Sequence, residues 1–250
     1  MNGGIEMAED RLVSKLIGAG LASAAAGLVG YTFLVRPWHL KWGATDEELR
    51  EPLPGDEALP NPEHQATHAI TINAPVSDVW PWLVQLGQTR GGFYSYTWLE
   101  NIVGCEMRNA DRVVPEWQTL RVGDVVWLHP KAPPLPVIIV EPYRAIVLGG
   151  QGESVDDDTV VISGTWGLYL KEIDENTTRL LIRNRGIHAP GPIGWLFNYA
   201  IFEPAHFIME RKMMLGIKER AEALARERAK LAESSAAVEA IPEAFSTHAR

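Results

Sequence analysis

The pattern of apolar and polar positions divides this chain into three parts, and the first part is a long apolar run. Residues 16–35 carry no charged side chain and are bracketed by Lys15 and Arg36. At 1.5 Å per residue, a helix of this length reaches ~30 Å, which matches the hydrocarbon core of a bilayer. The run therefore predicts a single-pass membrane protein with a transmembrane helix at 16–36, preceded by an N-terminal tail at 1–15.

Two other interpretations of the apolar run compete with a retained anchor. Small residues at Ala22, Ala24 and Ala26 offer the cleavage pattern of a signal peptide, but the run continues to Val35 and three acids precede the first base. A buried helix of a soluble protein is the second alternative, but no polar face interrupts the run. The retained anchor is the interpretation that we favour.

The second part is a polar connector at residues 37–64. Four prolines are interleaved here with two acidic clusters: Pro52, Pro54, Pro60 and Pro62. Proline and clustered acids are typical of extended chain that buries little surface. We expect a solvated, Pro-rich linker.

The third part, residues 65–232, has the alternations of regular secondary structure. Ile70 and Ile72 alternate with polar neighbours and predict a strand that ends at Pro75. A short helix follows with Gly87 as its stop, and a second short helix includes Tyr94, Trp98 and Ile102 on one face. Turn residues separate the next strand candidates, which are 124–129, 137–141, 145–148, 160–171 and 177–187. Their short spacing favours an antiparallel meander.

A long amphipathic helix closes the domain, from about Glu203 to Leu231, and a disordered tail is expected at 233–250. Its apolar stripe consists of Phe207, Met214, Ile217, Ala221 and Leu224. A sheet with one apolar face needs a cover, and only this helix is long enough to supply it. The expected fold class is α+β, with a curved antiparallel sheet wrapped on the C-terminal helix and a cavity between them.

Two stretches of the domain resemble a known superfamily. One is the strand-to-helix turn with Ala74, Pro75, Val79 and Trp80, and the other is the run RGGFYSYTWLEN at 90–101. Together they resemble the START-like (SRPBCC) superfamily of polyketide cyclases/dehydrases and lipid-transport proteins, in a bacterial subgroup of it, over roughly residues 65 to 230. The resemblance implies a helix-grip fold with a hydrophobic ligand cavity. It does not imply one function, because this fold serves carriers, receptors and enzymes.

Composition narrows the possible partners. Hydrophobic residues make up 46% of the chain, which supports a core, and the net charge is -9 without any basic cluster. Binding to nucleic acid needs concentrated Lys and Arg, so nucleic acid is not an expected partner. Cys105 is the single cysteine, which excludes an intrachain disulfide and a cysteine metal cage. No zinc, phosphate-loop or serine-hydrolase motif is present, and we expect no metal and no cofactor.

Candidate ligand contacts come from the aromatic stretch and from inward-facing strand positions. Aromatic rings with polar tips suit a pocket that holds an apolar ligand and orients it through a few hydrogen bonds. The candidates are Arg90, Tyr94, Tyr96, Trp98, Trp166, Leu168 and Asn184. The alternative is that the aromatic residues pack the core and that Arg90 forms a surface ion pair.

Candidate acid/base residues lie at the start of the long helix. Glu203 and His206 form half of a carboxylate-histidine metal pattern without a second copy, and His206 and Glu210 are four residues apart on one helix face. His39, His64, His68 and His248 lie in or beside the linker and the tail, and we assign them no role.

The leading hypothesis is a membrane-anchored protein that binds a hydrophobic small molecule, lipid-like or polyketide-like, between sheet and helix. One alternative is an enzyme of the cyclase/dehydrase type that uses His206 with Glu210 or Glu203. Another is a regulatory module whose core is filled. The charge-free segment between Arg185 and Glu203 is either a buried connector or an apolar lid that dips into the bilayer.

Overall fold

A computed structural model describes residues 15–16, 18–20, 22–23, 26–150, 164–187 and 191–239. Its helices are η1 Tyr31–Val35, α2 Arg36–His39, α3 Asp46–Arg50, η2 Asp56–Ala58, α4 Val76–Val84, α5 Thr97–Ile102, η3 Pro115–Trp117, α6 Gly191–Phe197, η4 Asn198–Phe202 and α7 Glu203–Glu239. Its strands are β1 His64–Ile72, β2 Val125–Val126, β3 Leu135–Glu141, β4 Ala145–Gly150, β5 Gly164–Asp174 and β6 Thr177–Gly186. Residues 233–239, predicted as part of a disordered tail, continue helix α7. The predicted start of the fourth strand candidate, 160–163, and the rest of the predicted tail, 240–250, lie outside the described residues.

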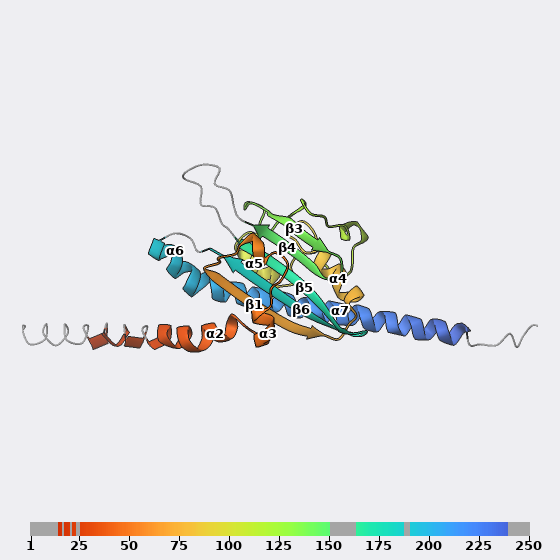
Figure 1. The fold of residues 1–250 in the computed structure, drawn as a ribbon, viewed down its shortest axis with the longest axis horizontal. Coiled ribbons are helices and arrows are strands. Elements are labelled where there is room, and N and C mark those ends of the chain that lie inside the picture. The colour runs from red at the N-terminus through yellow and green to blue at the C-terminus, as the bar shows by residue number, and fades with distance from the viewer. Residues whose placement is uncertain are drawn as a thin grey trace, which may run out of the picture.

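The six strands form one sheet in the order β1-β6-β5-β4-β3-β2, and every pair is antiparallel. The α+β class with a curved antiparallel sheet is therefore confirmed (Figure 1). Strand β1 pairs with β6, so the first strand of the domain lies beside the last one, with His68 opposite Ile182. This pairing brings residues of β1, β5 and β6 together at one end of the inner face.

Helix α7 runs along one face of the sheet, as Figure 1 shows, and covers it as predicted. Alternate strand residues point at the helix because side chains along a strand point to opposite faces in turn. The resulting core includes Ile70, Ile72, Leu168, Leu170, Leu180, Ile182, Met213, Met214, Ile217 and Ala221, all buried. Each large side chain of this kind contributes ~1.5–3 kcal/mol on burial, so this contact surface is the main source of stability.

The connector is not extended and solvated as predicted, because it folds onto the outer face of the sheet. Thr45 caps α3 through a capping box with Glu48. Leu53 and Leu59 are buried, and Leu53 packs in a second apolar cluster with Leu181 of β6. The physical reason is that both faces of β6 carry side chains that need cover, and the connector supplies it on the side away from α7.

Polar contacts hold the connector on the sheet. Arg183 of β6 is 2% exposed and donates to the main-chain oxygens of Glu48 and Glu51 at 2.7 and 2.9 Å and to the Asp56 carboxylate at 2.7 Å. Arg179 donates to the Glu48 carboxylate at 2.7 and 2.8 Å. The acids of the connector therefore neutralise basic residues of the strand.

The aromatic stretch forms a compact loop and then α5. Tyr94 takes a positive φ of 55°. Its main-chain oxygen lies so close to Gly216 of α7 that a Cβ atom added to this glycine would be only 2.4 Å away from that oxygen. The loop thus passes so close to α7 that only glycine fits at position 216. Because Phe93 and Tyr94 are both buried there, they fill part of the space between sheet and helix.

The predicted anchor is only partly described, since residues 17, 21, 24 and 25 lie outside the described set. Within the described residues, no helix combines the length and the apolar character needed to cross a bilayer.

Candidate ligand site around Glu210

A buried carboxylate lies between the sheet and α7, at the end where β1, β5 and β6 meet. Glu210 of α7 is 3% exposed. Its Oε2 accepts hydrogen bonds from Trp166 Nε1 at 3.0 Å and from Asn184 Nδ2 at 2.7 Å. Its Oε1 lies 2.5 Å from Nδ1 of His68. Each strand therefore sends one donor to the same carboxylate.

Strand register explains this convergence. Trp166 of β5 pairs directly with Asn184 of β6, and Asn184 pairs in turn with Ala66 of β1. Residues opposite each other in a sheet project from the same face, about 5 Å apart. His68 follows two residues after Ala66 and projects from that face too. Glu210 occupies the helix turn between buried Phe207 and Met214, so it lies on the stripe that faces these strands.

Glu210 is held in its ionised form. Burial by itself raises the pKa of the carboxyl group, but the hydrogen bond and charge of His68, with smaller contributions from His206 and Asn184, lower it to about 2. The other nitrogen of His68, Nε2, lies 2.7 Å from the main-chain oxygen of His39. Both partners of His68 are acceptors, so the buried ring links the Glu210 carboxylate on α7 to the main chain of His39.

His206 stands beside this cluster without a hydrogen bond to it. Its Nε2 is 3.9 Å from Glu210 Oε2, beyond hydrogen-bond reach, and its side chain is 34% exposed. The ring stacks on Phe202, with centroids 5.7 Å apart. Partial burial lowers the pKa of His206, and the charge of Glu210 only partly opposes this effect. His206 is therefore a neutral imidazole at pH 7.

The cluster has an open side. Trp166 and Asn184 are half-buried, and no hydrogen bond within the described chain uses Oδ1 of Asn184. Phe93 lies against Trp166, with ring centroids 5.8 Å apart. We call Trp166, Asn184 and His206 the rim of the Glu210 site. It offers one free acceptor, one neutral imidazole and aromatic walls.

Four predicted site residues, Trp166, Asn184, His206 and Glu210, therefore meet at this site. A fifth, Leu168, is a buried core residue two positions along β5 from Trp166.

The remaining ligand candidates lie elsewhere. Tyr94 is 1% exposed and donates from its hydroxyl to the Trp82 main chain. Tyr96 lies near Lys212, whose Nζ is 6.0 Å from the ring centroid, and Trp98 is 65% exposed. The guanidinium of Arg90 donates to the main-chain oxygens of Trp117 and Thr119, so in this structure it secures a loop.

Sequence reasoning misses His68, because it groups this residue with the histidines beside the linker. The signal is present in the strand alternation, since His68 shares its parity with the inward-facing Ile70 and Ile72. A histidine in register with an apolar strand face is buried and needs a polar partner.

Glu203, the third acid/base candidate, belongs to a separate cluster. It is 4% exposed and accepts two hydrogen bonds from Arg36, at 2.8 and 2.9 Å. Nδ1 of His64 lies 3.0 Å from Glu203 Oε1. Burial raises the pKa of Glu203, but the hydrogen bonds from His64 and Arg36 lower it to about 2. This cluster ties α2 to the start of α7.

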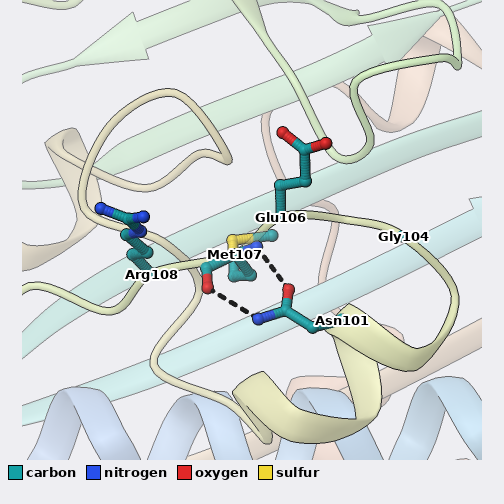
Figure 2. A pocket seen from close by; sticks show the side chains of 5 residues that line it. All are labelled: Asn101, Gly104, Glu106, Met107 and Arg108. Atoms are coloured by element: carbon teal, nitrogen blue, oxygen red, sulfur yellow. Dashed lines mark hydrogen bonds between the residues drawn. The ribbon is translucent and has the colours of Figure 1, made fainter.

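Two hollows of the described surface lie away from the Glu210 cluster. The first is about 550 Å³ and is lined by Asn101, Gly104, Glu106, Met107 and Arg108. Figure 2 shows that Asn101 bridges to the main chain of Met107, through bonds of 3.1 and 2.5 Å. The second is about 260 Å³ and lies between Arg90 and Trp117.

The enclosed cavity predicted between sheet and helix is not among these hollows. Core side chains, including Phe93, Tyr94 and Met214, occupy that space in the described residues. The side chains of the aromatic loop therefore fill space that we expected a ligand cavity to occupy. Within the same residues, no group of three or more His, Cys, Asp or Glu side chains is arranged to hold a metal ion.

The fold and the site define an α+β protein whose sheet grips a long helix around a buried carboxylate cluster. No protein-family profile matches the chain, and no curated protein matches it. A polyketide cyclase-like protein of Corynebacterium glutamicum is 20% identical, with 68% of this chain and 94% of that chain covered and a TM-score of 0.30. The Aha1 protein of Colwellia psychrerythraea is 12% identical, with 64% and 96% covered and a TM-score of 0.36. A protein of Nitrosospira multiformis is 12% identical, with 65% and 99% covered and a TM-score of 0.39. Similarities at this level do not place the chain in a family.

Proposed function

We propose that this chain is a membrane-anchored binding protein for a hydrophobic small molecule, whose polar end is held at the Glu210 site. The observation that carries the proposal is the convergence of His68, Trp166 and Asn184, from three different strands, on one buried ionised carboxylate. Three donors and a nearby imidazole around one acid exceed what helix-to-sheet packing needs.

The rim has the chemistry of a site that orients a ligand. Asn184 Oδ1 and the ring nitrogens of His206 can accept from or donate to a hydroxyl, carbonyl or amine. The rings of Trp166, Phe93 and Phe202 offer apolar walls beside them. Apolar walls with a few placed polar groups are typical of small-molecule sites. Because the interior is packed, the ligand we propose seats at this rim.

The anchor remains part of the proposal. It is supported by the charge-free run at 16–35 and by the exposure of its apolar side chains, such as Phe33 at 71% and Leu34 at 75%. Tethering at a membrane would keep the protein near a hydrophobic ligand that is scarce in water.

Native mass spectrometry of the full chain, released from cells in a mild detergent, tests the binding function. The full chain is required because a cut after the connector would expose the outer face of β6. We expect a reproducible co-purifying mass of lipid size that is lost in Asn184→Leu and retained in Ile173→Ala, an exposed position on the same sheet. A bare protein that also takes up nothing from a lipid extract would favour the regulatory module with a filled core.

An enzyme of the cyclase/dehydrase type is the second candidate, and the pair of His206 and Glu210 favours it. A carboxylate 3.9 Å behind a neutral, partly exposed imidazole can stabilise the imidazolium that forms when His206 takes a proton. If the compound bound by wild type is chemically altered, while His206→Ala binds the same compound unaltered, the protein is an enzyme.

A further inference from the structure

Two charge-free stretches that are far apart in sequence lie side by side at one end of the molecule. The first is the part of the N-terminal helix that precedes Arg36. We use the name N-terminal helix for residues 26–39, which are helical throughout. The second is the α6–η4 segment, residues 191–202. Tyr199 Oη donates to Thr32 Oγ1 at 2.6 Å, and Tyr31 Oη donates to the Tyr199 main-chain oxygen at 3.1 Å. Figure 1 shows α2 and α6 at the same end of the sheet.

The outward sides of both stretches are apolar. On the N-terminal helix the exposed large side chains are Leu28, Val29, Phe33, Leu34, Val35 and Trp38. On the α6–η4 segment they are Trp195, Leu196, Phe197, Ile201 and Phe202. We call these two sets the apolar end. Soluble monomers seldom expose so many neighbouring apolar side chains, and such a surface marks an interaction site.

The distribution of this surface around the helix distinguishes a bilayer from a protein partner. Residues 26, 27, 28 and 29 are consecutive and all exposed, and four consecutive residues go once around a helix. A helix that is apolar on every side suits a medium that surrounds it. A second copy of the chain would cover one side only.

The charge-free part of each stretch ends at the same place in the structure. Arg36 is the first charged residue after the run at 16–35, and Glu203 is the first after 186–202. These two residues form the bidentate pair at 2.8 and 2.9 Å. Trp38 and Tyr199 lie within a few residues of the pair, and such rings favour the membrane interface. The paired charges, together with these rings, mark a boundary between the apolar end and the polar domain.

We infer that the α6–η4 segment is a second membrane-contacting element, which enters the lipid beside the N-terminal helix, with the Arg36–Glu203 pair at the interface. The inference rests on the proposed membrane anchoring. Its consequence for the site is direct, because Phe202 of this segment stacks on His206 of the rim. The rim then opens next to the lipid, and the ligand reaches it from the bilayer.

Site-specific fluorescence on the full chain tests the inference. In a Cys105→Ser background, Phe197→Cys, Val29→Cys or Ile173→Cys is labelled with a polarity-sensitive dye and reconstituted in phosphatidylcholine/phosphatidylglycerol vesicles. All three positions are more than half exposed, so the substitutions spare the core. We expect spin-labelled lipid to quench the dye at 197 and 29 several-fold more strongly than the dye at 173, which aqueous iodide quenches instead.

The other outcomes separate the two proposals. If the dye at 197 is quenched by iodide while the dye at 29 is quenched by lipid, the second element is refuted and the anchor stands. If both dyes are quenched by iodide, the anchoring itself fails. If the dye at 197 is shielded from both quenchers in a concentration-dependent way, a second copy covers the segment and the inference is wrong.

Discussion

Helix α7 carries two buried carboxylates seven residues apart, Glu203 and Glu210, and they differ in what surrounds them. Residues at this spacing lie on one helix face. Both are almost inaccessible, and their partners lower the pKa of each to about 2. Burying a charge costs several kcal/mol unless partners compensate, and the two sites compensate differently.

Glu203 is matched by a fixed charge, whereas Glu210 is matched by groups that can change. Arg36 covers Glu203 in a bidentate geometry and cannot lose its proton. Glu210 instead takes donors from three strands and has the titratable His206 beside it. The Glu203 pair is thus suited to docking the N-terminal helix, while the Glu210 cluster keeps an open rim and adjustable protonation, as a binding or catalytic site requires.

The largest expected effect is that of Glu210→Ala. It removes the carboxylate that His68, Trp166 and Asn184 all contact, and breaking a buried pair in this way costs about 3–5 kcal/mol. The free energy of unfolding, measured by denaturant titration, should fall by that amount. Glu219→Ala, an exposed position on the same helix, is the control. Equal, small losses in the two variants would show that Glu210 is not ionised and paired.

Arg36→Ala should have a smaller and more local effect. It leaves Glu203 buried without its fixed counter-charge, at a cost of about 1–3 kcal/mol, and the N-terminal helix undocks while the sheet stays folded. Hydrogen exchange should become faster at residues 26–39 and stay unchanged in β5 and β6. Arg36→Lys should not restore protection, because an ammonium cannot make the bidentate contact. Arg226→Ala, exposed on α7, controls for loss of charge.

How far the sequence predicts these two clusters depends on whether their residues follow a local period. Trp166 and Asn184 follow strand alternation, and His206 and Glu210 follow helix spacing, so sequence reasoning identifies them as site candidates. The pairing of Arg36 with Glu203 joins residues 167 positions apart, and no local period indicates it. His68 does follow the alternation of Ile70 and Ile72. It is missed when it is grouped with the other histidines near the linker, and its inward-facing position on the strand is not considered.

The connector and the cavity show the same limit. Acids and prolines at 37–64 are typical of solvated chain, yet Arg179 and Arg183 on the outer face of β6 bind those acids. The alternating arginines are visible in the sequence, but their partners become evident only in three dimensions. The predicted cavity follows from sheet curvature alone, whereas its filling by Phe93 and Tyr94 depends on how one loop packs against Gly216.

Acid pH should lower the free energy of unfolding, and the histidines should lose their contribution at a higher pH than Glu203 and Glu210 do. Burial lowers the pKa of His39 to about 4 and lowers the pKa of His206 as well. The unfolded chain then binds more protons than the folded one below about pH 6.5. The contribution of these histidines is complete above that pH and falls as pH drops from 6.5 toward 4, while the contributions of the two carboxylates are lost only between about pH 4.5 and 2.

The measurement is thermal unfolding at about pH 7.5, 6 and 5, a range that spans the ordinary histidine pKa. His39→Phe keeps a ring against Phe207, whose centroid is 5.3 Å from that of His39 in the native contact, and removes one titrating group. Its unfolding temperature should therefore decline less steeply with acid than that of wild type. A decline that is identical in the two proteins would assign the acid sensitivity to other groups.

The smallest expected effect on stability is that of His206→Ala, and it separates site from scaffold. His206 makes no hydrogen bond to Glu210 at 3.9 Å and is a third exposed, so its removal should change the free energy of unfolding by less than about 1 kcal/mol. Affinity for the co-purified ligand should nevertheless fall about tenfold, as expected for losing one net hydrogen bond of ~1.4 kcal/mol. His68→Ala should do the reverse and lower stability first, because that ring is the fully buried partner of Glu210. If ligand affinity is unchanged in His206→Ala, the rim is not the binding surface, and the Glu210 cluster is a structural feature like its neighbour at Glu203.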